Sequence, residues 1–216
     1  LEDVRQIRIG TLPNLPLTIL APICAEYHRL YPATEIIFVE RHAPDYLASF
    51  QNNEFDISAD YMSRLVLPEQ DICFTPLAND SFDCAVSPES ELARKERLTL
   101  DDLVGKKVYL LAPNLAQAED TMRRIITTSG KSIKITNING YSRSLPIMCL
   151  LEGAVFIHYH INGDEYQPLV SLPLDAGQPC PVRLGLCYKR DASREVRSFV
   201  LFASEYCGTQ LGIIDK

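Results

Sequence analysis

The sequence from Lys107 to Tyr159 is KVYLLAPNLAQAEDTMRRIITTSGKSIKITNINGYSRSLPIMCLLEGAVFIHY. Short apolar runs in it predict strands, and they alternate with segments of helical spacing in which Met122, Ile125 and Ile126 share one face. Gly130 and Gly153 follow the predicted helices, as expected of helix-ending residues. The expected order is β-α-β-α-β, with strands at 107–112, 133–138 and 154–159 and helices at 117–128 and 142–152.

The same order is expected earlier, over residues 6–60. Strands are predicted at 7–10, 35–39 and 55–59, with a helix of about 14 residues starting near Thr18 and a second at 44–52. Further strands are expected within 72–88, at 169–174 and at 184–188. Thr99 and Gly105 bound a predicted short helix, and Ser193 is expected to cap the last one.

Strands that alternate with helices predict parallel sheets covered on both faces, which is an α/β fold. Two such units joined by two crossover segments predict two Rossmann-like lobes. We expect lobe I to comprise residues 4–87 and 162–216, and lobe II to comprise residues 88–161. In open α/β sheets, ligands bind beyond the carboxyl ends of the strands.

Composition narrows the classes of function. The chain has 216 residues, 46% of them apolar, and a formal charge of −7 from 28 acidic and 21 basic side chains. Nucleic-acid affinity comes mainly from Lys and Arg, so DNA contact is expected only through a part of the protein outside this chain. No apolar run approaches the roughly 18 residues of a membrane span, and the first residues do not resemble a signal peptide.

Seven cysteines are present, an odd number without any C-x-x-C pair. Most lie in apolar segments, so we expect reduced, structural thiols and a cytoplasmic location. A redox switch would need a second cysteine near Cys149 in lobe II, and a core thiol is the preferred explanation.

Several short motifs resemble the regulatory domain of LysR-type transcriptional regulators over nearly the whole chain. Residues 53–59, NEFDISA, resemble the family's "GELDLAI" segment, and residues 98–105, LTLDDLVG, resemble "VTLADLAG". Residues 75–77 and 84–88 resemble its "EPL…LVAP" crossover, while residues 152–157 stand where the family has "AGLGIALLP". Each motif is short, but their shared order and spacing are fairly specific.

The resemblance implies a fold like that of type II periplasmic solute-binding proteins, with a small effector bound between the lobes. It implies an effector-sensing domain without catalytic activity or cofactor, and a winged helix-turn-helix that precedes Val4 in the full protein. It also implies a homodimer through this domain, with the first helix and second strand of one copy against the second lobe of the other. Tyr27, His28 and Tyr31 are the expected interface residues, and a tetramer is an option for the full-length protein.

The binding site is expected where predicted strands end. Helix N-termini there would favour a carboxylate on the ligand, whereas Asp60 would favour an accompanying amine. Replacing Thr11 or Asn14 by Ala is expected to weaken binding and leave the fold intact. The candidate ligand-binding residues are Thr11, Leu12, Pro13, Asn14, Asp60, Tyr61, Asn114, Arg143, His158 and Tyr159.

Other sites are weaker candidates. His158 and His160 alternate on a predicted strand and would face one side, but no spacing supplies the further ligands of a metal site. No motif of nucleophilic catalysis occurs, and Arg123 and Arg124 are expected on a solvated helix face. A free-standing solute-binding protein remains the alternative function, and an enzyme on the same fold is a third.

Overall fold

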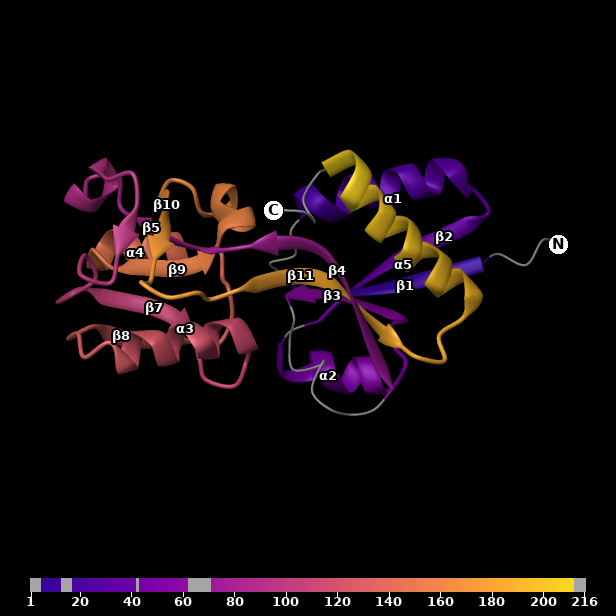
Figure 1. Cartoon of the computed structure of the whole chain (residues 1–216), viewed down its shortest axis with the longest axis horizontal. Coiled ribbons are helices and arrows are strands. Elements are labelled where there is room, and N and C mark those ends of the chain that lie inside the picture. Colours follow the sequence, from indigo (N-terminus) through magenta and orange to yellow (C-terminus); the bar gives the residue numbers. More distant parts are fainter. Residues whose placement is uncertain (1–4, 13–16, 42, 62–70, 212–216) are drawn as a thin grey trace. The chain divides into compact units, whose positions relative to one another are not determined.

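The structure is a computed structural model, and it describes residues 5–12, 17–41, 43–61 and 71–211. The chain divides into two compact units, of which unit 1 holds residues 1–79 and 183–216 and unit 2 holds residues 80–182. Among the described residues, no helix is both long enough and apolar enough to cross a bilayer. Figure 1 labels the elements.

Unit 1 is built on a five-stranded sheet in the order β2-β1-β3-β11-β4. Strands β1 to β3 are parallel neighbours, and β11 runs antiparallel to β3. The three helices pack so that α1 and α5 lie to one side of the strands and α2 to the other (Figure 1). The elements are β1 (Arg5–Thr11), α1 (Leu17–Leu30), β2 (Thr34–Glu40), α2 (Ala43–Gln51), β3 (Ile57–Tyr61), β4 (Ile72–Asp80), β11 (Val182–Lys189), α5 (Arg194–Tyr206) and a following π-helical turn (Cys207–Leu211).

The absence of a side chain at Gly10 lets β1 approach an aromatic cluster. A Cβ there would lie 2.3 Å from the Phe55 ring, whose neighbours are Tyr46 and Phe50. The Tyr46 hydroxyl donates to the Gly10 carbonyl at 2.9 Å. Leu12 packs against the same cluster, so the chain just beyond β1 is anchored by apolar contact.

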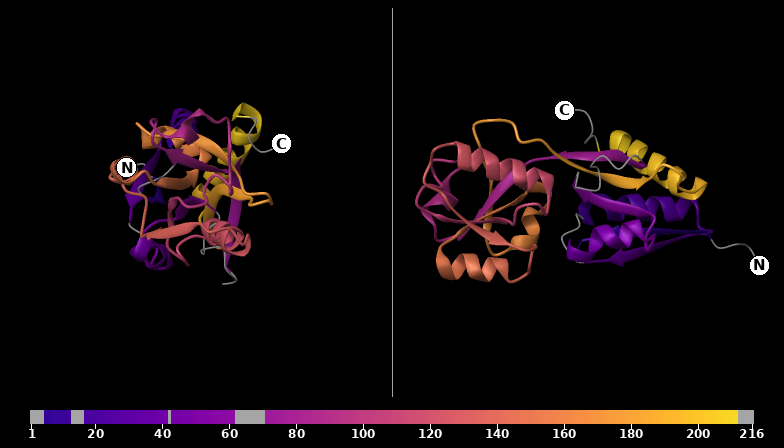
Figure 2. Two further views of the ribbon diagram at one scale, coloured as in Figure 1. Left: turned by 90° about the vertical axis from the view of Figure 1, so that its left-hand side faces the viewer. Right: turned by 90° about the horizontal axis from the view of Figure 1, so that it is seen from below.

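Unit 2 is built on a six-stranded sheet in the order β6-β10-β5-β9-β7-β8. Strands β8, β7 and β9 are parallel, β5 is antiparallel to β9 and β10, and β10 is parallel to β6. Helices α3 and α4 flank this sheet (Figure 2, right). The elements are β5 (Phe82–Val86), a 3-10 helix (Glu91–Arg94), β6 (Leu98–Thr99), β7 (Lys107–Leu111), α3 (Gln117–Thr128), β8 (Lys134–Ile138), α4 (Leu145–Glu152), β9 (Val155–Tyr159), the 3-10 helix η3 (His160–Tyr166) and β10 (Val170–Asp175).

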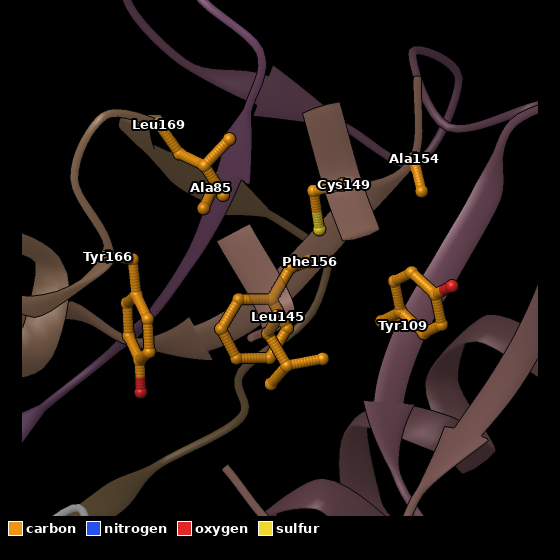
Figure 3. Close-up of a cluster of buried hydrophobic side chains, with 8 residues drawn as sticks. All are labelled: Ala85, Tyr109, Leu145, Cys149, Ala154, Phe156, Tyr166 and Leu169. Atoms are coloured by element: carbon orange, nitrogen blue, oxygen red, sulfur yellow. The ribbon is translucent and has the colours of Figure 1, made fainter. Parts of the chain in front are cut away.

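Phe156 of β9 lies at the centre of the unit 2 core, fully buried (Figure 3). Leu145 and Cys149 reach it from α4, Tyr109 from β7, and Tyr166 from η3. The Tyr166 ring meets Phe156 edge-on at 4.9 Å. The core therefore holds α4 and η3 against β9.

The predicted β-α-β-α-β order is confirmed in both units, but two local predictions are wrong. Residues 100–105 form successive turns and no helix, because Thr99 pairs with β10 as a strand residue and the following N–H groups of Asp102, Leu103 and Val104 donate to the carbonyls three residues back. Helix α4 begins at Leu145, three residues after Ser142, whose hydroxyl accepts the backbone N–H of Ser144.

The boundaries between the units also differ from those predicted. Residues 80–87 and 162–182 were expected in lobe I but belong to unit 2. The reason is strand pairing, since β5 lies between β9 and β10 and completes their sheet. The chain therefore enters unit 2 before β5 and leaves it after β10.

Candidate functional site

In unit 1, four candidate residues gather at the carboxyl end of two neighbouring parallel strands. Thr11 ends β1 and is 5% exposed, and Leu12 follows it. Asp60 and Tyr61 end β3, where the Asp60 carboxylate accepts the backbone N–H of Tyr61 at 2.7 Å. Pro13 and Asn14 lie outside the described residues. This edge thus brings a hydroxyl, a carboxylate and apolar surface together.

The Asp60 carboxylate lies on the α2 side of the sheet. It raises the pKa of Tyr46 on α2, after the larger effect of burial, and likewise that of the Cys187 thiol. Ser58, two residues earlier on the same side, hydrogen-bonds to the Tyr46 hydroxyl at 2.8 Å. A cationic ligand group at this edge would therefore meet negative charge beside a neutral polar network.

In unit 2, the four candidates lie at the carboxyl ends of β7, β8 and β9, but only two expose their side chains. Asn114 and Arg143 are exposed, whereas His158 and Tyr159 are 0% and 2% exposed. Asn114 has a φ of 70°, and its backbone N–H donates to the Asp120 carboxylate at 2.9 Å. His158 and Tyr159 therefore contribute to the interior of unit 2 beneath this edge.

His158 is held as a neutral imidazole. Its Nδ1 lies 2.8 Å from the Tyr159 carbonyl oxygen, which only accepts, so Nδ1 carries the proton. Its Nε2 then accepts from the Ser171 hydroxyl, 3.1 Å away. Burial lowers the pKa of His158, although the Tyr159 carbonyl opposes this effect. Such a ring orders the core and is unsuited to proton exchange with solvent.

His160 differs from His158 in exposure, because its side chain is 61% exposed whereas His158 is fully buried. Strand β9 ends at Tyr159, and His160 begins η3. Its Nδ1 lies 2.9 Å from the buried carboxylate of Asp83, and this hydrogen bond raises the pKa of His160. Among the described residues, no group of three or more His, Cys, Asp or Glu side chains is arranged to hold a metal ion.

Arg123 also departs from its expected place on a solvated face. Its guanidinium turns back onto the sheet, and Nη2 donates to the carbonyl of Leu111, the last residue of β7, at 2.5 Å. Burial lowers the pKa of Arg123, and its buried Nε has no hydrogen-bond partner among the described residues. A cation therefore lies at the carboxyl end of β7, while Arg124 is exposed as predicted.

Sequence reasoning missed Glu119, which is 1% exposed in the first turn of α3. Its Oε1 accepts the Tyr141 hydroxyl at 2.6 Å. Its spacing from Met122 and Ile126 places it on the buried helix face, and this was the available signal. An acidic residue in the first turn of a helix is usually explained by its interaction with the helix dipole. For that reason Glu119 was not considered as a buried residue.

The seven cysteines are all free. Cys84, Cys149, Cys187 and Cys207 are buried, and burial raises the pKa of the Cys149 thiol to about 12. Cys24 is half-buried, and the pKa of its thiol is raised to about 11. Thiols with so little thiolate react slowly, as expected of structural cysteines.

The family model described as "LysR substrate binding domain" matches residues 2–208 of this chain. The chain belongs to this family. It is 23% identical over 152 residues to the HTH-type transcriptional regulator MetR of Escherichia coli (strain K12), a match that covers 70% of this chain and 47% of MetR. The chain thus spans about half the length of this curated relative.

Two solved structures show the same fold as this LysR-type domain. The effector-binding domain of QuiR in complex with shikimate superposes with a TM-score of 0.80 at 14% identity, over 96% of this chain and 99% of QuiR. The BenM effector-binding domain with its effector benzoate gives 0.77 at 19% identity, over 98% of this chain and 96% of BenM. The predicted two-lobed architecture is therefore confirmed.

Proposed function

We propose that this domain senses a small polar effector at the strand-end edges of its units, and that this binding biases transcription by a bacterial LysR-type regulator. The carrying observation is that polar side chains in each unit gather at the carboxyl ends of parallel strands, where open α/β sheets bind ligands. The domain itself has no catalytic role, and DNA is bound by a helix-turn-helix outside this chain. An effector can shift the equilibrium between two conformations of the regulator only by the difference between its affinities for them.

The effector in this proposal carries a carboxylate and an amine. Arg123 and the exposed Arg143 supply positive charge at the edge of unit 2, and Asp60 supplies negative charge at the edge of unit 1. Shikimate and benzoate, with which QuiR and BenM were solved, are both carboxylates. A cytoplasmic location fits seven free cysteines, in contrast to a periplasmic solute-binding protein.

The effector class is tested by thermal unfolding with paired probes. Each α-amino acid is compared with the carboxylic acid that lacks its amine, alongside benzoate and shikimate. A ligand of the native state raises the Tm according to its concentration and dissociation constant. We expect amino acids to stabilise the domain more than their deaminated partners, and a panel without any stabilising member contradicts the carboxylate-amine class.

Arg143→Ala is a sharper variant than Thr11→Ala, because Thr11 is nearly fully buried and its truncation also disturbs packing. Losing a hydrogen bond to a charged group costs about 1.5–3 kcal/mol, so affinity for the stabilising probe should fall roughly ten- to hundredfold. Arg124→Ala removes the same charge from an exposed position on α3 and should leave affinity unchanged. Equal effects of the two variants would argue against a ligand contact by Arg143.

We also propose that the domain forms a homodimer, and that the full-length protein assembles further into a tetramer. Large apolar side chains are exposed on both surfaces that this pairing would use. In unit 1, Leu30 ends α1, Tyr31 follows it and Phe38 lies on β2, and these residues are 45–48% exposed. In unit 2, Ile147 and Leu151 of α4 are 59% and 82% exposed. These are apolar surfaces on the first helix, second strand and second lobe, as the family pairing requires. Tyr27, by contrast, is 2% exposed and packs edge-on against Phe199 of α5, so it belongs to the monomer core.

A further inference from the structure

Glu119 is a carboxyl group in an unusually apolar position. It projects from the first turn of α3 on the same buried face as Met122 and Ile126 and is 1% exposed. Burying a carboxylate without a compensating cation is costly, so the group must gain from its local partners. The Tyr141 hydroxyl donates a hydrogen bond to its Oε1 at 2.6 Å, and the Tyr159 hydroxyl lies close enough to favour the ionised form.

The two tyrosines come from different segments of unit 2. Tyr141 lies in the loop after β8, and Tyr159 is the last residue of β9. Their rings are 6.2 Å apart, and the Tyr141 ring also contacts Phe156 in the core. The Glu119 carboxyl therefore joins α3 to the loop after β8 and lies beside the end of β9, and these two strands flank β7 in the sheet.

Burial opposes the ionisation of Glu119, whereas its neighbours act in both directions. Burial raises its pKa most strongly, the hydrogen bond from Tyr141 and the nearby Tyr159 hydroxyl lower it, and Asp120 on the same helix raises it. The charge of Glu119 also contributes to the raised pKa values of Tyr166 in η3 and of Cys180 in the loop before β11. Because the net effect favours the neutral carboxyl, the buried position of Glu119 against Tyr141 is most stable below the ordinary pKa of Glu119 and becomes less stable as pH rises through the raised pKa.

We propose that Glu119 is a positioning residue that fastens the loop after β8 to α3 through Tyr141, whose ring packs near Tyr159 at the end of β9, and that ionisation of the Glu119 carboxyl loosens both segments. This rests on the proposed function only in treating these segments as part of the effector surface. The consequence for the regulator is an effector surface in unit 2 whose order depends on proton concentration.

Amide hydrogen exchange of the ligand-free domain tests the proposal without any effector. The readout is the protection of peptides covering residues 139–144, a segment without histidine, between about pH 5 and about pH 8 after correction for intrinsic exchange. Wild-type protection should fall as pH rises. Glu119→Gln keeps an acceptor oxygen and cannot ionise, so its protection should not depend on pH in this range.

Glu89→Gln is the matched control, because Glu89 is an exposed carboxyl of the same unit, and it should retain the wild-type pH dependence. Tyr141→Phe, which removes one hydroxyl, should lower protection of the segment about tenfold at the acid end, as expected for one net hydrogen bond. Wild-type pH dependence in Glu119→Gln, or unchanged protection in Tyr141→Phe, overturns the proposal. Either result leaves effector binding by the probe panel untouched, since that binding is measured separately.

Discussion

At the scale of single residues, His160 and Asp83 form the ion pair with the most evident pH dependence. The Asp83 side chain is 3% exposed and that of His160 is 61% exposed, so solvent reaches one partner and not the other. The hydrogen bond to Asp83 raises the pKa of His160 above its ordinary 6.5. The pair's contribution to stability is therefore complete below about pH 6.5 and is lost as pH rises through the raised value.

His160→Asn should accordingly reduce the free energy of unfolding more at about pH 5.5 than at about pH 8.5, by up to about 1 kcal/mol because the imidazole is largely solvated. Denaturant unfolding across this range measures it. His28→Asn, at an exposed position of α1, controls for loss of a histidine and should leave the pH dependence as in the wild type. A His160→Asn profile parallel to that of the wild type would contradict the pairing.

Residue types alone did not reveal which polar side chains would be buried. Thr11, Asp60 and Tyr61 could be placed at a strand-end edge, because parallel strands present their carboxyl ends together. His158 and Glu119 depend instead on partners distant in sequence, Ser171 and Tyr141 respectively. A single sequence does not indicate such pairs, so the strand-end residues of unit 1 were more predictable than the buried polar pairs of unit 2.

At the scale of elements, helix α4 depends on a glycine at its end. Gly153 has a φ of 61° and a left-handed conformation, and its backbone N–H bonds to the Cys149 carbonyl. A Cβ there would meet nothing within 4 Å, so the only cost of a side chain is backbone strain. Since α4 supplies Leu145 and Cys149 to the core around Phe156, strain at its end should destabilise unit 2 as a whole.

Gly153→Ala should therefore lower the free energy of unfolding by about 1–2 kcal/mol, the cost of a left-handed residue with a side chain. Gly140→Ala is the matched control, because it has equally open space and no positive φ. The control should change stability by no more than about 0.5 kcal/mol. Equal losses in the two variants, measured by denaturant unfolding, would show that the helix end is not the cause.

Element order was predictable because it follows from local periodicity, whereas element ends were decided by tertiary partners. The spacing of Met122, Ile125 and Ile126 and the glycine after α3 sufficed to place that helix. Residues 99–105 have the composition of a helix, yet Thr99 joins β10 through strand pairing that no local signal encodes. The unit boundaries have the same origin, since β5 belongs with β9 across more than 60 residues of sequence.

At the scale of the whole molecule, pairing of two copies is the property most open to a direct test. The proposed interface places α1 and β2 of one copy against unit 2 of the other, where Leu151 is 82% exposed on α4. Burying such a side chain contributes about 1.5–3 kcal/mol, and a charge in its place removes this gain. Leu151→Glu should therefore weaken dimerisation by at least about tenfold.

Sedimentation velocity across a micromolar concentration series measures the effect. Wild-type protein should sediment as a dimer at high micromolar concentration, and Leu151→Glu should sediment as a monomer over most of the series. Val104→Glu introduces the same charge at another exposed apolar residue of unit 2, on a turn outside α4, and should sediment like the wild type. A wild-type protein that sediments as a monomer would contradict dimerisation of the domain. Dissociation by Val104→Glu and not by Leu151→Glu would place the dimer interface elsewhere on the domain. Neither result would affect the proposal that one copy binds an effector.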